Sequence, residues 1–398
     1  MGKSETYKVA GFLANGIHVG IKESGEKDLS LIFSRRPATA AAVFTTNCFK
    51  AAPVLVDMER IRSGKIQAIV INSGVANAAT GEEGVADALA VSRALAAELK
   101  IDEEMILVAS TGVIGHRLPL TKIAAGMGKL TAGLYEDGIP DAEAGIMTTD
   151  RFPKIAYRRA VIDSREISIC GIAKGAGMIQ PNMATMLAFV MTDAAIDHDA
   201  LDALFRRSVN ATFNAVTVDG CMSTNDTAVI MANGEAGNKP FTKGSRSAAL
   251  FGDVLLDLML ELAKGMVRDG EGATKLIEVN VTEARTSRDA QKMAYAIANS
   301  NLVKTAFFGG DSNWGRIISA AGSVGVDLPV QNVELFLEDI PIFAGGKGVT
   351  GREKETAEIM KKEEIKMRFS AGMGKQSWRV WTSDLTFDYV KINAHYHT

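Results

Sequence analysis

Apolar residues along the chain form short continuous runs in some segments and helical stripes in others, and the two patterns alternate throughout. Ile66–Ile71 and Met105–Ala109 are short apolar runs, and each predicts a strand. In Glu82–Lys100 the apolar residues recur on one helical side, which predicts a helix. Thr185–Thr192 has no helical stripe and is bounded by turn residues, so it favours a buried strand.

The remaining elements follow from the same patterns. We expect helices from about Pro119, at Asp197–Val209 with Asp197 as its N-cap, at Ala248–Val267 and at Thr282–Asn299, strands within Val161–Ile172 and at Val333–Ile340, and a terminal hairpin at Trp378–Tyr396. No linker or low-complexity tract divides the chain. Strands and helices mix throughout, so the predicted fold class is α/β or α+β with large sheets.

The longest apolar stretch, Ala248–Val267, predicts an amphipathic helix and not a membrane span. Asp253, Asp257 and Glu261 are spaced by four residues and would form one polar stripe on that helix. A membrane span would carry these charges only at high cost. The helix is therefore expected to cover a protein core.

Composition narrows the class of protein further. The chain has 398 residues, enough for two domains or one large layered unit, and its net charge is −3. No basic field points to nucleic acid or to an anionic membrane. The three cysteines are unpaired in sequence and the first residues lack the apolar core of a signal peptide, so we expect a reduced, cytoplasmic protein.

A candidate nucleophile lies in the segment Lys174–Asp193. A glycine-rich run leads to the turn signal Pro181–Asn182, and the predicted strand begins at Thr185. The Thr185 hydroxyl would therefore stand where a loop becomes a rigid strand, which is a suitable place to hold a reactive group. A lone threonine at a strand start is nonetheless most often structural.

Two further short patterns carry possible chemistry. The turn Ser110–Gly115 follows a predicted strand and presents a hydroxyl beside an exposed backbone N–H, two donors that could stabilise an oxyanion. Most turns of this composition are only turns. Glu271 stands between two glycines in Arg268–Lys275 and is either a cation binder or solvated, and the residues alone favour the solvated state.

Several common catalytic motifs are missing from the sequence. It contains no phosphate-binding loop of the Gly-x-x-x-x-Gly-Lys-Ser/Thr type and no Gly-x-Ser-x-Gly elbow. His395 and His397 are close together, but no cysteine or second pair joins them, so no metal site is predicted. A nucleophile here would work without a histidine base, and a threonine that uses its own α-amine is the option left.

A series of fragments runs through the whole chain in a fixed order. They are GFLANGIHVGIK, FTTN, STGVIG, MTTD, KGAGMIQPNMATMLAF, TVDGCMSTNDT, RDGEGATK, GGDSNWGRI and DYVKINAHYHT. Each fragment alone is modest, but together and in this order they are very specific. They resemble the ornithine acetyltransferase / glutamate N-acetyltransferase family of arginine biosynthesis over essentially the whole chain.

The resemblance implies that the precursor cleaves itself between Ala184 and Thr185. The products would be a light chain of residues 1–184 and a heavy chain of residues 185–398, whose first residue is the nucleophile. The freed amine of Thr185 would serve as base for its own hydroxyl. Thr111 and the Gly112 N–H would hold the oxyanion.

The resemblance also implies the reaction. Acetyl would pass from N2-acetylornithine to glutamate by ping-pong transfer through acetyl-Thr185, with no cofactor and no metal. The family's substrate-binding positions correspond to Thr148, Lys174, Thr185, Glu271, Asn393 and Thr398. Lys174 suits the substrate carboxylate and Glu271 suits the ornithine ammonium. Some members of the family also use acetyl-CoA as donor, and nothing in the sequence decides this for the present chain.

The implied fold is a layered αββα-type sandwich resembling N-terminal-nucleophile hydrolases with a different strand connectivity, and the implied assembly is a heterotetramer of two light and two heavy chains. The sequence departs from the family pattern at Val75, Gln180 and Cys221, where Asn, His and Asp are expected. Two other hypotheses stay open: an aminopeptidase of the N-terminal-nucleophile type, and an inactive relative that only binds amino acids.

Overall fold

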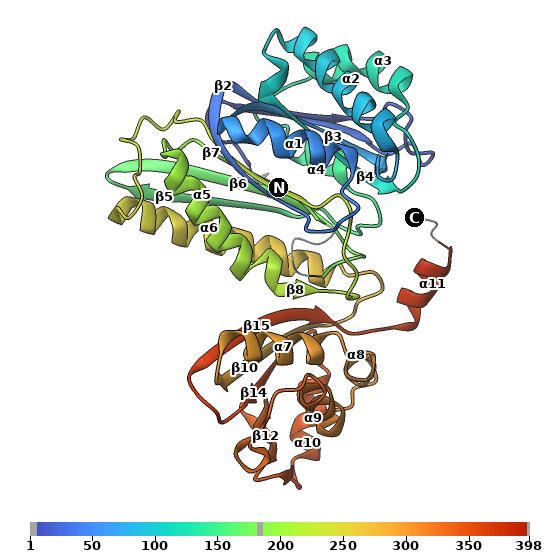
Figure 1. Cartoon of the computed structure of the whole chain (residues 1–398), viewed down its shortest axis with the longest axis vertical. Coiled ribbons are helices and arrows are strands. Elements are labelled where there is room, and N and C mark those ends of the chain that lie inside the picture. The colour runs from blue at the N-terminus through green and yellow to red at the C-terminus, as the bar shows by residue number, and fades with distance from the viewer. Residues whose placement is uncertain (1–5, 181–185, 396–398) are drawn as a thin grey trace, which may run out of the picture. The chain divides into compact units, whose positions relative to one another are not determined.

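The computed structural model describes residues 6–180 and 186–395 and divides them into two compact units (Figure 1). Unit 1 holds the described residues up to Asn214 together with Cys221–Met266, and unit 2 holds Ala215–Gly220 and the described residues from Val267 onward. Each unit contains one large sheet covered by helices. The predicted class, mixed α/β with two large sheets and helical layers, is confirmed.

The sheet of unit 1 has eight strands in the order β4-β3-β2-β9-β7-β6-β5, with β1 paired to β2. Their bounds are Phe12–Ile17 for β1, Leu29–Phe44 for β2, Lys65–Val75 for β3, Ile106–Val113 for β4, Ile155–Ile162 for β5, Arg165–Lys174 for β6, Leu187–Thr192 for β7 and Thr227–Ala232 for β9. β7 runs parallel to β9, with Leu187 opposite Thr227, and antiparallel to β6, with Leu187 opposite Lys174. The strand that follows Thr185 is thus central in this sheet.

Helices cover both faces of that sheet, as the alternation of apolar contacts along β3 shows. The helices of unit 1 are α1 (Ala52–Arg60), α2 (Gly81–Leu99), α3 (Leu120–Ala132), α4 (Ile139–Ile146), α5 (His198–Ala211) and most of α6 (Arg246–Arg268). Val70 packs in one core cluster with residues of α2 and α3, whereas Ile69 and Ile71 pack in another with residues of α4. Burial on both faces explains why these strands are continuous apolar runs.

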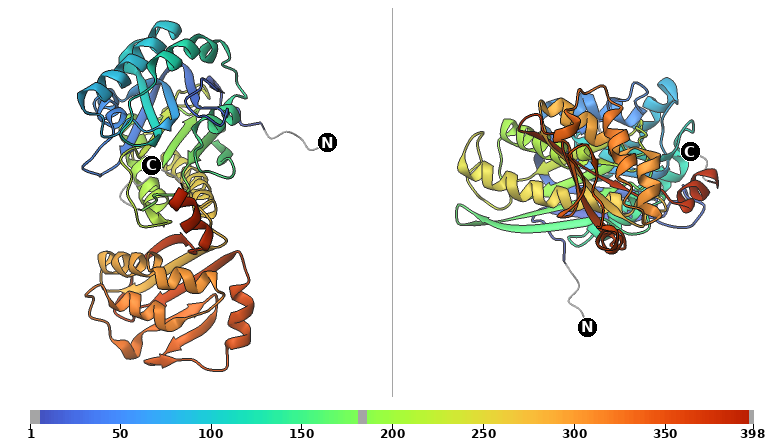
Figure 2. Two further views of the ribbon diagram at one scale, coloured as in Figure 1. Left: turned by 90° about the vertical axis from the view of Figure 1, so that its right-hand side faces the viewer. Right: turned by 90° about the horizontal axis from the view of Figure 1, so that it is seen from below.

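The long helix α6 lies along β5 and β6 (Figure 2). A Cβ at Gly171 of β6 would come within 2.8 Å of the Leu262 side chain, so the glycine permits this close approach. On the polar stripe, Arg158 donates to Asp257 at 2.7 Å and to Glu261 at 2.5 Å. The predicted amphipathic helix is confirmed, and among the described residues no helix is long and apolar enough to cross a membrane.

Unit 2 has a seven-stranded sheet in the order β13-β12-β11-β14-β10-β15-β8. The bounds are Val216–Thr217 for β8, Leu276–Ala284 for β10, Glu334–Leu337 for β11, Ile340–Ala344 for β12, Lys347–Gly348 for β13, Glu364–Ser370 for β14 and Gln376–Ser383 for β15. Its helices are α7 (Ser287–Ala298), α8 (Asn301–Phe308), α9 (Trp314–Gly322), α10 (Glu353–Met360) and α11 (Phe387–His395). Ile297, Phe307 and Phe369 lie in one core cluster that joins helices to strands.

Several predicted elements need correction. The predicted terminal hairpin is wrong, because β15 is followed by α11, where the Thr386 hydroxyl accepts a hydrogen bond from the Tyr389 N–H in the first turn. The predicted helix at Thr282–Asn299 begins too early, because its first residues belong to β10. Asp197 does occupy the N-cap position of α5, but its side chain makes no capping hydrogen bond.

Candidate active site

Three residues expected at the site converge in unit 1. Lys174 is the last residue of β6, and its side chain is buried. Its Nζ donates to Thr148 Oγ1 at 2.7 Å and to Thr111 Oγ1 at 3.2 Å. A buried ammonium and two hydroxyl groups therefore meet at the ends of β4 and β6, although they come from three distant parts of the chain.

Thr111 and Gly112 lie within β4, which extends to Val113 and not only to the predicted Ala109. Gly112 pairs with Gly74 of the parallel strand β3, and its φ is 131°. A Cβ at this position would lie 2.3 Å from the Gly74 carbonyl carbon. Both the backbone angle and the close neighbour require glycine here. The role of its N–H in holding an oxyanion stays a prediction.

The buried carboxylate of Asp150 forms hydrogen bonds beside this cluster. Asp150 accepts hydrogen bonds from the Thr148 N–H at 2.9 Å, the Gly175 N–H at 2.8 Å and Lys154 Nζ at 2.6 Å. Burial alone would raise the pKa of Asp150, but the ammonium groups of Lys174 and Lys154 outweigh it and hold that pKa well below its usual range. The charged Asp150 thus fixes the backbone beside both Thr148 and Lys174.

A further lysine, Lys22, approaches the same region, and the sequence analysis missed it. Its Nζ donates to the Met147 carbonyl at 2.6 Å, directly before Thr148. Burial lowers the pKa of Lys22, and the nearby Lys174 charge lowers it further. The fragment GFLANGIHVGIK contained Lys22. Together with Lys174 it adds positive charge to this region.

Two other predicted residues, Glu271 and Asn393, meet in unit 2. Asn393 lies on α11, and its Nδ2 donates to Glu271 Oε2 at 2.8 Å. The Glu271 loop is anchored, because the Thr386 hydroxyl donates to the Gly272 carbonyl at 2.8 Å. Gly272 has a φ of 69°, and a Cβ there would lie 2.5 Å from the Tyr389 nitrogen. Glu271 is therefore a half-buried, held side chain and not the freely solvated one that the residues alone favoured.

A buried lysine supports this loop. Lys304 of α8 donates through Nζ to Thr382 Oγ1 at 3.1 Å and to the Ser383 carbonyl at 2.5 Å. The next residue, Asp384, accepts hydrogen bonds from the Thr274 and Lys275 N–H groups, at 2.8 and 3.0 Å. Burial lowers the pKa of Lys304 to about 8, although Asp384 and Asp219 act against it. The sequence carries no signal for this role, because Lys304 stands in an apolar helical stretch.

The remaining predicted residues, Ala184, Thr185 and Thr398, lie outside the described part of the chain. The residue after Thr185 is described and firmly held. The Met186 N–H donates to Asp226 Oδ1 at 2.8 Å, and the Met186 carbonyl accepts from the Thr227 N–H at 3.1 Å. The Thr111–Thr148–Lys174 cluster belongs to unit 1 and the Glu271–Asn393 pair to unit 2.

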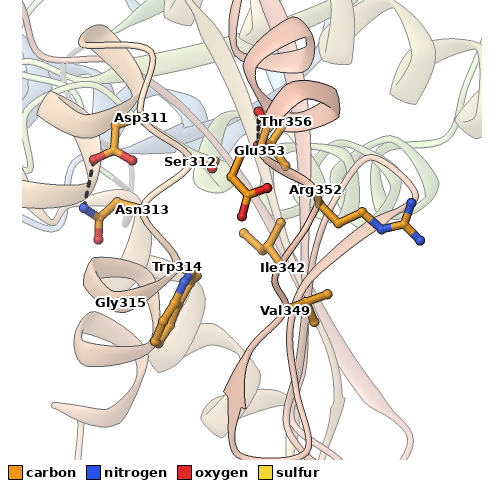
Figure 3. A pocket seen from close by; sticks show the side chains of 10 residues that line it. All are labelled: Asp311, Ser312, Asn313, Trp314, Gly315, Ile342, Val349, Arg352, Glu353 and Thr356. Carbon is orange, nitrogen blue, oxygen red and sulfur yellow. Dashed lines mark hydrogen bonds between the residues drawn. The ribbon is translucent and has the colours of Figure 1, made fainter.

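A hollow of about 360 Å³ opens in unit 2 and includes part of the fragment GGDSNWGRI (Figure 3). None of the predicted site residues lines it. Its charged groups have partners: Asp311 accepts from Asn313, Glu353 accepts from the Gly351 N–H, and Arg352 pairs with Glu355. Among the described residues no group of three or more His, Cys, Asp or Glu side chains could hold a metal ion.

Known proteins of one family resemble this chain over almost its whole length. A family model described as the ArgJ family matches residues 13–398. The Arginine biosynthesis bifunctional protein ArgJ of Geobacter sulfurreducens is 50% identical over 98% of this chain and all of that protein. The protein of that name from Caldanaerobacter subterraneus is 48% identical over 100% of this chain and 99% of its own. The crystal structure of Arginine biosynthesis bifunctional protein argJ from Bacillus halodurans superposes with a TM-score of 0.51 at 41% identity, covering 52% of this chain and 98% of that one.

Proposed function

Because the chain belongs to the ArgJ family, we propose that it is a self-cleaving acetyltransferase of arginine biosynthesis, which transfers acetyl from N2-acetylornithine to glutamate. The observation that carries this proposal is the convergence of the Lys174 ammonium on the hydroxyl groups of Thr111 and Thr148. An ammonium and hydroxyl groups suit a substrate carboxylate and a developing oxyanion.

In the proposed maturation step the Thr185 hydroxyl attacks the Ala184 carbonyl and displaces the Thr185 nitrogen. Water then opens the ester, which leaves residues 1–184 and 185–398 as separate chains. The match to the Bacillus halodurans structure supports this step, since 98% of that chain covers only 52% of the present one. A chain of about half the precursor length is what cleavage near residue 185 would produce.

In the proposed transfer the Thr185 oxygen attacks the acetyl carbon of N2-acetylornithine, and the bond from that carbon to the ornithine nitrogen breaks. The Thr185 amine, whose pKa would be about 7.7–8.0 for an ordinary α-amino group, takes the hydroxyl proton and passes it to the leaving nitrogen. Thr111 and the Gly112 N–H stabilise the oxyanion. The glutamate amine then attacks acetyl-Thr185, which releases N-acetylglutamate and restores the hydroxyl.

In this proposal, different residues bind the negatively charged and the positively charged groups of the substrate. Lys174 with Thr148 would hold the substrate carboxylate, and Glu271 with Asn393 would hold the ornithine ammonium, with Thr398 completing the set. The reaction needs no cofactor or metal, and acetyl-CoA is a possible second donor for N-acetylglutamate synthesis. We further propose a cytoplasmic heterotetramer of two light and two heavy chains.

Two measurements on the purified protein test the proposal. Intact mass under denaturing conditions should show two fragments that separate between Ala184 and Thr185, whereas Thr185→Ala should remain one chain of 42.4 kDa. Beyond one equivalent per active site, ornithine release from N2-acetylornithine should then require glutamate. Continued turnover without glutamate would favour the aminopeptidase hypothesis, and an uncleaved wild-type chain would favour the binding-only hypothesis.

A further inference from the structure

Lys22 is held in place by the buried carboxyl group of Asp28. This group accepts the backbone N–H groups of residues 19–22, at distances from 2.6 to 3.1 Å. Asp28 is itself anchored to β3, because its carbonyl accepts the Ser73 N–H at 3.0 Å. The turn that carries Lys22 is therefore fixed by the core of unit 1, as a binding residue requires.

The Lys22 side chain runs toward the candidate site of unit 1. A Cβ at Gly74 would lie 3.4 Å from Lys22 Cγ, and Gly74 is the strand partner of Gly112. At its far end, Lys22 Nζ donates to the Met147 carbonyl at 2.6 Å, and the next residue is Thr148. Lys22 therefore extends from the neighbour of Gly112 to the neighbour of Thr148.

Two ammonium groups thus contact consecutive residues of one segment. Lys22 Nζ binds the carbonyl of Met147, and Lys174 Nζ binds the hydroxyl of Thr148 at 2.7 Å. Burial lowers the pKa of Lys22 and the Lys174 charge lowers it further, although nearby carboxylates act against both. Two like charges that repel each other favour a ligand with two negative groups.

Lys22 retains a hydrogen-bond donor for such a ligand. A lysine ammonium has three donors and no acceptor. One donor is used by the Met147 carbonyl at 2.6 Å and one by the Lys27 carbonyl at 2.9 Å. Both acceptors are neutral, and among residues 6–180 and 186–395 the third donor has no acceptor. The half-buried Lys22 can therefore bind a carboxylate without losing either contact.

The two substrates of the proposed transfer differ in their number of carboxylates. N2-acetylornithine carries one, whereas glutamate carries two. Lys174 with Thr148 is proposed to hold the carboxylate that both substrates share. The side-chain carboxylate of glutamate then needs a cation of its own, because a charge taken out of water without a partner is costly.

We propose that Lys22 binds the side-chain carboxylate of glutamate and so selects the acceptor, an inference that rests on the proposed function. Lys22 Nζ and Lys174 Nζ contact residues whose Cα atoms are about 3.8 Å apart. Three carbon atoms separate the two carboxylates of glutamate, so a molecule of that length suits a pair of cations spaced in this way. Lys22 is a specificity-determining residue in this proposal and takes no part in bond making or breaking.

Lys122 supplies a matched control within unit 1. It lies on α3, is exposed, and donates through Nζ to the Gly20 carbonyl at 2.5 Å, in the same turn that carries Lys22. Both lysines therefore bind a backbone carbonyl. The contact of Lys122 is with Gly20, however, and not with the residue before Thr148.

The test compares Lys22→Met and Lys122→Met with the wild type, all as fully cleaved enzyme. In ping-pong transfer, kcat/KM for each substrate reports the half-reaction of that substrate. Loss of a hydrogen bond between charged groups predicts that Lys22→Met loses roughly 10- to 100-fold in kcat/KM for glutamate, and much less for N2-acetylornithine. Lys22→Arg keeps the charge and should recover part of the loss, whereas Lys122→Met should match the wild type for both substrates.

A comparison of acceptors needs no variant. Glutamine has nearly the size of glutamate but lacks the second negative charge. The wild type should therefore prefer glutamate over glutamine by roughly 10-fold or more in kcat/KM, and Lys22→Met should lose most of this preference. A wild type that acetylates both acceptors equally well would overturn the role of Lys22, even if Lys22→Met does not fold.

The remaining outcomes are distinct. Equal losses for glutamate and N2-acetylornithine in Lys22→Met would mean that Lys22 only holds the backbone at Met147, and the specificity role is then overturned. Unchanged kinetics in Lys22→Met would overturn it as well, and in both cases the proposed function stands. If the wild type transfers no acetyl from N2-acetylornithine to any acceptor, the proposed function fails, and the role of Lys22 fails with it.

Discussion

Lys174 Nζ donates to Thr148 Oγ1 at 2.7 Å, and this contact joins the end of β6 to the segment that Asp150 holds in place. The ammonium is buried, and its positive charge helps to hold the pKa of Asp150 well below its usual range. The contact therefore fixes the position of the group that we propose to bind the substrate carboxylate.

Replacing Lys174 with Met should raise KM for N2-acetylornithine. The substitution keeps most of the side-chain length but removes the charge, and a hydrogen bond to a charged group contributes about 1.5–3 kcal/mol, which corresponds to roughly 10- to 100-fold in affinity. Steady-state kinetics on fully cleaved enzyme would measure it. Lys239→Met, at an exposed position of unit 1, is the control and should leave KM unchanged. An unaltered KM in Lys174→Met would remove Lys174 from substrate binding.

Thr111→Val should act on kcat more than on KM. Thr111 Oγ1 accepts a hydrogen bond from Lys174, which leaves its own proton for another acceptor such as an oxyanion. Loss of one oxyanion donor typically costs about 100- to 1000-fold in kcat. Thr111→Ser retains the hydroxyl and should recover most of the rate. Equal activity of the Val and Ser variants would show that the hydroxyl takes no part in the transition state.

Lys304 should give the protein a distinctive alkaline stability profile. Its pKa is lowered to about 8 in the folded chain, against about 10.4 for an ordinary lysine. Between these two values the unfolded chain binds more protons at this residue than the folded chain, so its contribution to the free energy of unfolding rises with pH. Below about pH 8 both states are charged, and the cost of burying the charge is then fully present.

The measurement is the urea midpoint of unfolding across that pH window, for the wild type and for Lys304→Met. The difference between the two proteins isolates Lys304 from the other titrating groups. The wild type should gain stability relative to the variant as the pH rises, and the gain should end near the ordinary lysine pKa. A pH-independent difference would mean that the burial of Lys304 does not shift its titration in this direction.

How far the sequence anticipates the structure depends on how local the signal is. Periodicity alone predicted α2 and α6, because each buries one stripe against a continuous core. It failed at the chain end, where FDYVKI partly alternates like a strand although Phe387–His395 is helical. That helix depends on contacts outside its own sequence, such as the Asn393–Glu271 hydrogen bond between residues 122 positions apart.

The site residues also differ in whether a local sequence signal predicts them or only distant contacts explain them. The ordered fragments identified the family, which the comparisons confirm, and they pointed to Thr111, Thr148 and Lys174 before any geometry was known. They did not reveal Lys304 or the buried carboxyl group of Asp226. Both depend on burial and on partners distant in sequence: Lys304 binds Ser383 across 79 positions, and Asp226 binds Met186 across 40. No local pattern encodes such a neighbour.

Glu271→Gln tests the residue that the sequence alone left ambiguous. Glutamine still offers an oxygen to Asn393 Nδ2, so the 2.8 Å contact that holds the loop can persist while the negative charge is lost. Losing a charged partner for the ornithine ammonium should raise KM for N2-acetylornithine by roughly 10-fold or more, with a smaller change in kcat. Glu358→Gln, an exposed residue of α10 that pairs with Lys361, is the control and should not alter KM. Since Glu271 is proposed to act by charge and not by shape, a normal KM in Glu271→Gln would exclude it from the site, whereas a raised KM that Glu271→Asp partly restores would support the charge itself as the binding element.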